Sequence, residues 1–329
     1  MNQAATVRIE DVIAYETLIS QNLLRERGTI SERQAASLLG VTPPQYTWPQ
    51  QALMLPGYFW SSPVSSDVYR LIDAGFKLGP DQAVTEAGIS AARQYTSDLL
   101  GVDLQTVRVE VVPSTEWNHD HAAEGFQIRV GLTDHMIFVP AEFPAPVELL
   151  CHEFGHAGHT TAQRVNGELS YFFTMPTTAE FVAHFCQYNY LLDHGTRDDF
   201  VSALGQLTTA TFALSIMASN VLDDFEEFLK SEYAQAITEA MSMEVIERTY
   251  LAFSADKPHL QREALRGMAI ILALWVVDEH EGMKRFISAD RIDQTLDVKL
   301  DAAFPGVDFM DAFSNVNEQI YKLLDRFNR

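Results

Sequence analysis

Residues 146–163 carry the sequence PVELLCHEFGHAGHTTAQ, in which apolar residues recur with the spacing of one helix. His152 and His156 are four residues apart, so a turn of 3.6 residues places both imidazoles on one face. Glu153 follows about 100° further around the helix. In this H-E-x-x-H spacing two histidines hold one zinc ion and the glutamate serves as a general base. The sequence therefore predicts a zinc site, with His152 and His156 as ligands and Glu153 as the catalytic base.

A catalytic zinc site takes three protein ligands and leaves one position open for water. Position 162, six residues after His156, is Ala, so a third histidine at that spacing is excluded. Glu180 lies 24 residues after His156 and is the favoured third ligand. Two alternatives stay open. Thr177 and Glu180 also fit a capping box at a helix start, and Glu168 is a competing carboxylate.

Further polar residues cluster near these positions. His159 lies one turn beyond His156, and His184 lies one turn beyond Glu180, where it orients a ligand, binds substrate or is an ordinary core histidine. Tyr171 lies between the two predicted helices. The candidate substrate-binding residues are therefore His159, His184 and Tyr171. The histidines of residues 117–121 fall between two predicted strands, where a solvated turn is favoured over a second metal site.

Composition limits the function classes. The 329 residues are 47% hydrophobic, which suffices for one large domain or two closely packed lobes. Asp and Glu number 45 against 23 Lys and Arg, and the net charge of −22 disfavours nucleic acid and anionic membrane as partners. The first residues include Arg8, Glu10 and Asp11, unlike a signal peptide, and the apolar run Met268–Val277 is too short to cross a bilayer. We expect a cytoplasmic protein; its oligomeric state is left open.

The element pattern predicts a mainly α fold with a small β-sheet. Helical patterns cover Val7–Arg27, Ser31–Leu39, Ser65–Ala74, Pro80–Leu100 and most of the chain from Thr177 onward. Strand patterns cover Val107–Val112, Phe126–Leu132 and Met136–Val139, directly before the H-E-x-x-H helix. Residues 1–103 are expected to form an N-terminal helical region, and residues 104–329 a catalytic region, within one compact unit.

The stretch Val147–His159 resembles the motif helix of the thimet oligopeptidase and oligoendopeptidase F family, which reads H-E-x-G-H-A-x-H. Members place an edge strand before this helix, as Met136–Val139 would be here, and a glutamate ligand about 25 residues after the second histidine, which Glu180 nearly matches. The resemblance covers about residues 105–290 and implies a zincin-like helical metallopeptidase of the gluzincin type. It implies Zn²⁺ as cofactor and short peptides as substrate, held in extended form along the edge strand.

This chain is shorter than typical members and departs from them on a late helix. That helix carries a histidine and several tyrosines that stabilise the oxyanion in the family. His259 is a plausible counterpart here, but Ala264, Met268 and Ile271 occupy places where tyrosines are expected. Tyr250 is a further candidate donor, so the expected catalytic residues are Glu153, His259 and Tyr250. Tyr171 and Tyr188 are weaker candidates for the same role.

Two other functions remain as alternatives. Residues 30–42 resemble the first helix and turn of a helix-turn-helix domain, which regulatory zinc proteases combine with H-E-x-x-H. The following candidate recognition helix, Pro43–Trp48, is short and is ended by Pro49, and the net charge opposes DNA binding. A non-catalytic helical interaction protein is the other alternative.

Overall fold

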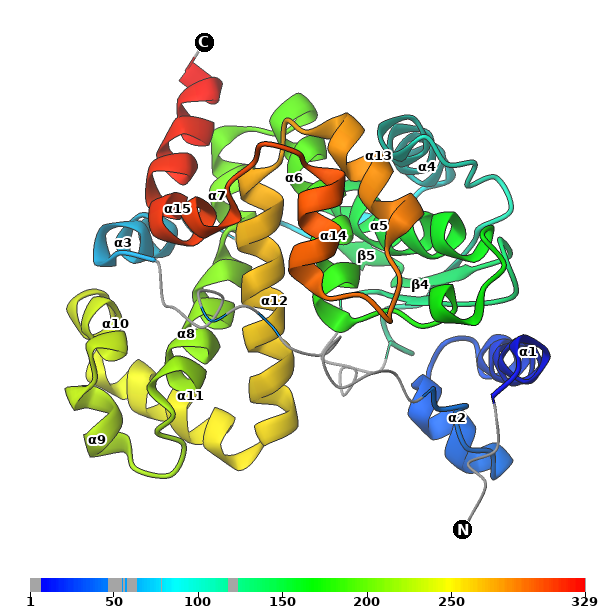
Figure 1. Cartoon of the computed structure of the whole chain (residues 1–329), viewed down its shortest axis with the longest axis horizontal. Helices are drawn as coiled ribbons and strands as arrows, with labels where there is room; N and C mark the ends of the chain where they lie inside the picture. Colours follow the sequence, from blue (N-terminus) through cyan, green and yellow to red (C-terminus); the bar gives the residue numbers. More distant parts are fainter. Residues whose placement is uncertain are drawn as a thin grey trace. The chain divides into compact units, whose positions relative to one another are not determined.

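The computed structural model describes residues 7–46, 55, 57, 64–77, 79–117 and 124–328. Within these residues the chain is mainly helical with a small β component, which confirms the expected fold class (Figure 1). The helices are α1 (Ile9–Arg25), α2 (Glu32–Leu39), α3 (Ser66–Gly75), α4 (Glu86–Leu100), α5 (Pro146–Arg164), α6 (Pro176–His194), α7 (Arg197–Ala203), α8 (Gly205–Ser219), α9 (Phe225–Lys230), α10 (Gln235–Ala240), α11 (Met243–Ala255), α12 (Lys257–Trp275), α13 (His280–Ala289), α14 (Leu296–Ala303) and α15 (Phe309–Leu324). The strands are β1 (Gln82–Ala83), β2 (Arg108–Val112), β3 (Phe126–Ile128), β4 (Met136–Pro140) and β5 (Glu142–Phe143).

The N-terminal helices follow their sequence signals closely. In α2, Ser31 and Gln34 form a capping box, and Gly40 ends the helix in the left-handed region with φ 64°. The expected helix Pro80–Leu100 begins later, at Glu86, because Gln82–Ala83 pairs with β5 instead and Thr85 caps the helix. The proline-rich segment 40–63 lies largely outside the described residues.

The three-stranded sheet has the order β2-β4-β3. Strand β4 is central, parallel to β2 with Val109 opposite Ile137, and antiparallel to β3 with Phe126 opposite Phe138. All five residues of β4 are buried. The expectation that Met136–Val139 is an edge strand is therefore wrong, because both sides of β4 are paired. Among the residues that the structure describes, the edges of this sheet are β2 and β3.

Contacts between Cα atoms group the chain into two compact units, which we describe separately. Unit 1 contains residues 1–54, 79–175 and 280–304, and unit 2 contains residues 55–78, 176–279 and 305–329. In unit 1, α5 packs against α4 and α13 and contacts β3 and β4. In unit 2, α12 packs against α6, α8 and α15. These units interleave along the sequence, whereas the expected division at residue 104 is a single cut and stays a prediction.

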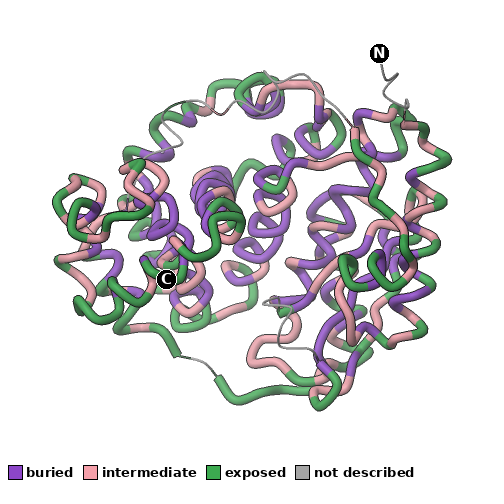
Figure 2. The backbone as a smooth tube through the Cα atoms, turned by 90° about the horizontal axis from the view of Figure 1, so that it is seen from below, coloured by how far each residue is buried: buried purple, intermediate pink, exposed green. Residues whose placement is uncertain are grey.

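The buried residues gather along the inner faces of the helices (Figure 2). In unit 2, α12 is buried from Gly267 to Leu274. Among the described residues, the segment Arg197–Ser219 is long and apolar enough to cross a membrane, and 67% of its most apolar window is buried inside the structure. Burial of that extent is what a core helix of a globular protein shows.

Candidate metal centre

Helix α5 presents two histidines from an otherwise closely packed surface. Pro146 lies in the first turn, and α4 on one side and the sheet on another bury most of the helix. His152 and His156 are partly exposed, and their rings lie 4.8 Å apart between centroids at an angle of 85°. The four-residue spacing thus places both imidazoles on one face, as the sequence predicts.

Glu153 lies beside these histidines and is only 4% exposed. Gly125, the residue before β3, packs directly against it. A Cβ atom at position 125 would lie 3.2 Å from Glu153 Oε1, 3.3 Å from its Cγ and 3.3 Å from the carbonyl oxygen of Phe138. The start of β3 therefore forms one wall around the Glu153 carboxylate, and a Cβ atom at position 125 would require its neighbours to shift by a few tenths of an ångström.

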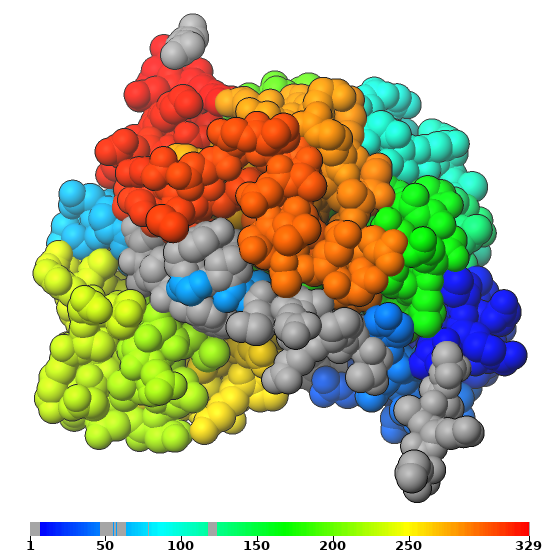
Figure 3. Space-filling view, in the orientation of Figure 1, coloured from blue at the N-terminus to red at the C-terminus, as the bar shows by residue number. Residues whose placement is uncertain are grey.

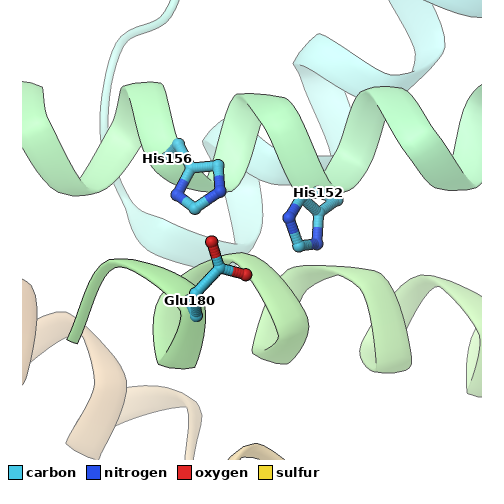
Figure 4. Close-up of side chains that lie close together, drawn as sticks. All are labelled: His152, His156 and Glu180. Carbon is cyan, nitrogen blue, oxygen red and sulfur yellow. The ribbon is translucent and has the colours of Figure 1, made fainter. Parts of the chain in front are cut away.

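Glu180 completes a possible ligand set. The ligand atoms of His152, His156 and Glu180 all lie within 4.8 Å of one another, and the Glu180 carboxylate points toward the two imidazoles (Figure 4). The two alternatives for this region find other roles. Thr177 lies inside α6 and its hydroxyl makes no hydrogen bond, so no capping box forms, and Glu168 is ion-paired with Arg291 at 2.6 Å.

The donor set fits a transition metal ion. Two imidazoles and one carboxylate are a common zinc ligand set, in which donors 2.0–2.1 Å from a tetrahedral ion lie about 3.4 Å apart. The ligand atoms in the structure all lie within 4.8 Å of one another, an upper limit somewhat wider than this spacing. Other divalent ions accept the same donors, so the chemistry of the ligands favours zinc without being specific to it.

The surroundings of Glu180 explain why its pKa is raised. Burial raises the pKa of Glu180 to about 7; Arg266 opposes this shift and Glu263 adds to it. His184 is fully buried one turn further along α6, and its Nε2 lies 3.5 Å from Glu180 Oε2. The other ring nitrogen, Nδ1, lies 2.8 Å from Gln187 Oε1, so it donates its proton to that amide oxygen. His184 is thereby oriented with one nitrogen toward the Glu180 carboxylate.

His159 belongs to a buried ion-pair network. Its Nε2 lies 2.9 Å from Asp290 Oδ2, and both side chains are 1% exposed. Asp290 Oδ1 lies 2.6 Å from Lys299 Nζ, and Gln163 donates to the Asp290 carboxylate and carbonyl oxygens. Asp290 lies between α13 and α14, which form the orange surface in Figure 3. These contacts give His159 a structural role in place of the substrate-binding role expected from the sequence.

The remaining predicted residues have other neighbours. Tyr171 lies under the guanidinium of Arg291, 5.3 Å from ring centroid to Cζ. Tyr250 is 1% exposed, and its hydroxyl donates to the carbonyl of Val221 and accepts from the N–H of Asp224. His259 lies in the first turn of α12, with its ring 5.3 Å from that of Phe253. The ligand group formed by His152, His156 and Glu180 includes none of the three.

Two functional candidates were missed by sequence reasoning. These candidates are Glu263 and Arg266 on α12, which act electrostatically on Glu180. Ala264, Met268 and Ile271 on the same helix are all fully buried. Glu263 and Arg266 could be seen in the sequence, because they carry opposite charges three residues apart just before a long apolar stretch. This spacing indicated only an ordinary ion pair on a helix surface, since the sequence does not show which side of α12 packs against α6.

A scan against protein-family models, a search of curated proteins and a search of solved structures each find no match to this chain.

Proposed function

We propose that this protein is a zinc-dependent peptidase that cleaves short peptides. The observation that carries the proposal is the group formed by His152, His156 and Glu180, whose ligand atoms lie within 4.8 Å of one another directly beside Glu153. The donor types, their spacing and an adjacent buried carboxylate together meet the requirements of a hydrolytic zinc site. Peptide as the substrate class rests on the resemblance of the α5 sequence to the oligopeptidase family.

In this proposal His152, His156 and Glu180 hold the ion. Zinc, when bound there, would supply Lewis acidity that lowers the pKa of water to about 7. Glu153 accepts the proton of the attacking water and then passes it to the departing amine. Its 4% exposure keeps competing solvent away from the carboxylate during both transfers.

The strand that we propose to pair with the substrate is β3, in place of β4. An extended peptide adds to a sheet only along an unpaired edge, and β4 is paired on both sides. Strand β3 is an edge of the sheet, and Gly125 at its start packs against Glu153. A peptide lying along β3 would therefore pass the catalytic carboxylate, which supports β3 as the strand that binds substrate.

A zinc-binding protein without hydrolytic activity is the second candidate. It is favoured by the buried Ala264, Met268 and Ile271, since α12 offers no phenol at the positions where the family has oxyanion donors. The regulatory-protease alternative gains no support, because residues 41–46, which follow α2, are not helical. We therefore propose no nucleic-acid partner.

Zinc-loaded wild-type protein and its Glu153→Gln variant, incubated with a mixture of short synthetic peptides and assayed by mass spectrometry, test the proposal. The wild type should cleave peptides, and the variant should bind the same amount of zinc and lose cleavage by at least a thousandfold. Equal cleavage by both proteins would show that the activity arises elsewhere. No cleavage by zinc-loaded wild type would favour the non-hydrolytic candidate.

A further inference from the structure

A partly buried ion pair lies on α12, the helix that packs along α6, and α6 carries Glu180. Glu263 and Arg266 are 13% and 29% exposed, and Arg266 Nη1 lies 3.4 Å from Glu263 Oε1. Helix α12 packs along α6 within unit 2, and both charges act on Glu180. A cation and an anion on the adjacent helix therefore act electrostatically on a candidate metal ligand.

Stability does not explain this pair. It joins side chains three residues apart through one contact at 3.4 Å, a kind of pair that contributes little to folding. Both charges are nevertheless largely withdrawn from water, which is unfavourable for each. Partly desolvated charges clustered beside a candidate ligand are typical of functional sites.

Of the two side chains, Arg266 is the one equipped to bind a further group. A guanidinium carries five N–H donors, and the contact with Glu263 uses one of them. Arg266 is also more than twice as exposed as Glu263, whose carboxylate holds one edge of the guanidinium in place. The planar fork that results matches the two oxygens of a carboxylate.

We propose that Arg266 binds a carboxylate of the substrate, either the C-terminal carboxylate or an acidic side chain near the cleaved bond. This inference rests on the proposed function and deepens it, because it names the class of peptide that the site selects. Arg266 is then a specificity-determining residue, and Glu263 positions it.

Small hydroxamates test this assignment independently of peptide sequence. The probes are the monohydroxamates of malonic, succinic, glutaric and adipic acid, each compared with the analogue in which a carboxamide replaces the free carboxylate. The hydroxamate group chelates zinc in every probe, and the series of chain lengths spans a range of distances. Isothermal titration calorimetry gives the dissociation constants for zinc-loaded wild type, Arg266→Gln, Arg266→Lys and Arg262→Gln. Arg262, exposed one turn earlier on α12, is the matched control.

At the best chain length the carboxylate probe should bind wild type at least tenfold more tightly than its amide, the discrimination expected of one charge-assisted hydrogen bond. Arg266→Gln should abolish the preference with zinc still bound, Arg266→Lys should restore part of it, and Arg262→Gln should keep it. Equal affinity for acid and amide at every length in wild type, or a preference that survives Arg266→Gln, would overturn the assignment and leave the peptidase proposal standing. Failure of every hydroxamate to bind would remove the zinc site and both proposals with it.

Peptides then identify the source of the carboxylate. Zinc-loaded Glu153→Gln protein, which should not turn peptides over, is titrated with an alanine tripeptide in its acid and amide forms, and with amidated Ala-Glu-Ala. A preference for the acid form assigns the C-terminus, and tight binding of amidated Ala-Glu-Ala assigns an acidic side chain; either result supports a carboxylate contact. Loss of either preference on adding Arg266→Gln confirms that Arg266 makes it, and a preference that persists overturns the proposal.

Discussion

Gly125 makes room for the carboxylate of Glu153: a Cβ atom at position 125 would lie 3.2 Å from Glu153 Oε1 and 3.3 Å from Glu153 Cγ. Such distances are shorter than most real Cβ contacts, so any larger residue at position 125 must push the glutamate side chain aside. The conformation of the proposed catalytic base is therefore set partly by a residue 28 positions earlier in the chain (153 − 125). This contact also brings the start of an edge strand to the proposed reacting group.

Gly125→Ala should lower peptide turnover on the order of tenfold while zinc binding stays unchanged. The added methyl displaces Glu153 by a few tenths of an ångström, and proton transfer is sensitive to such displacements. The measurement is kcat together with zinc stoichiometry. Gly79→Ala is the matched control, since its nearest neighbour, the Pro144 carbonyl oxygen, is 4.0 Å away. An unchanged kcat in Gly125→Ala would show that Gly125 does not position Glu153.

Asp290→Asn should destabilise the protein by about 3–5 kcal/mol, because it leaves Lys299 as a buried charge without its counterion. Urea unfolding at neutral pH measures the loss. The double variant Asp290→Asn with Lys299→Met removes both charges and should recover part of it. A loss below about 1 kcal/mol in Asp290→Asn would contradict the structural role assigned to the network.

The same network should contribute to acid denaturation. Burial alone raises the pKa of Asp290, but Lys299 and His159 outweigh it and hold the pKa well below the usual range. A carboxyl whose pKa is depressed in the folded state adds stability above its unfolded pKa of about 3.9, and this stability is lost as pH falls further. Urea unfolding between pH 5 and pH 3 should therefore show a steeper loss in wild type than in Asp290→Asn.

In metal-free protein, the contribution of Glu180 to stability should have the opposite pH dependence to that of Asp290. Its pKa is raised to about 7 in the folded state, so the folded protein holds this proton more tightly than the unfolded chain. As pH rises from about 4.5 to 7 the unfolded chain loses its proton first, and the metal-free protein loses stability. Glu180→Gln should therefore be more stable than wild type at pH 8, by on the order of 1–3 kcal/mol, and equal to it near pH 4.5. A difference that does not depend on pH would contradict the raised pKa; Glu318→Gln, on the exposed side of α15, is the control.

Local signals in the sequence predicted the local structure well. The H-E-x-x-H helix ends within one residue of the predicted boundary, and α2 lies within one residue of the predicted range Ser31–Leu39. These features depend on residues a few positions apart. The order of the sheet does not: the pattern of Met136–Val139 is that of a buried strand, but only long-range pairing with β2 and β3 makes it central.

The candidate site shows the same difference between local and long-range features. His152, Glu153 and His156 follow from the spacing within one helix, whereas Glu180 could be proposed only alongside the capping alternative with Thr177. Neighbours that are brought together only by tertiary packing could not be predicted from the sequence. No periodicity indicates that Gly125 packs on Glu153 or that Arg266 acts electrostatically on Glu180, because both relationships arise from how separate elements meet.

The most direct test of the central claim is the zinc content of gently purified protein, wild type beside Glu180→Ala, measured by atomic emission with circular dichroism as the check on folding. We predict about one zinc per chain in wild type and a much lower content in the folded variant, because the variant lacks one of three ligands. Wild-type protein that contains no zinc and takes up none on addition, or a variant that retains the full content, would contradict the three-ligand site.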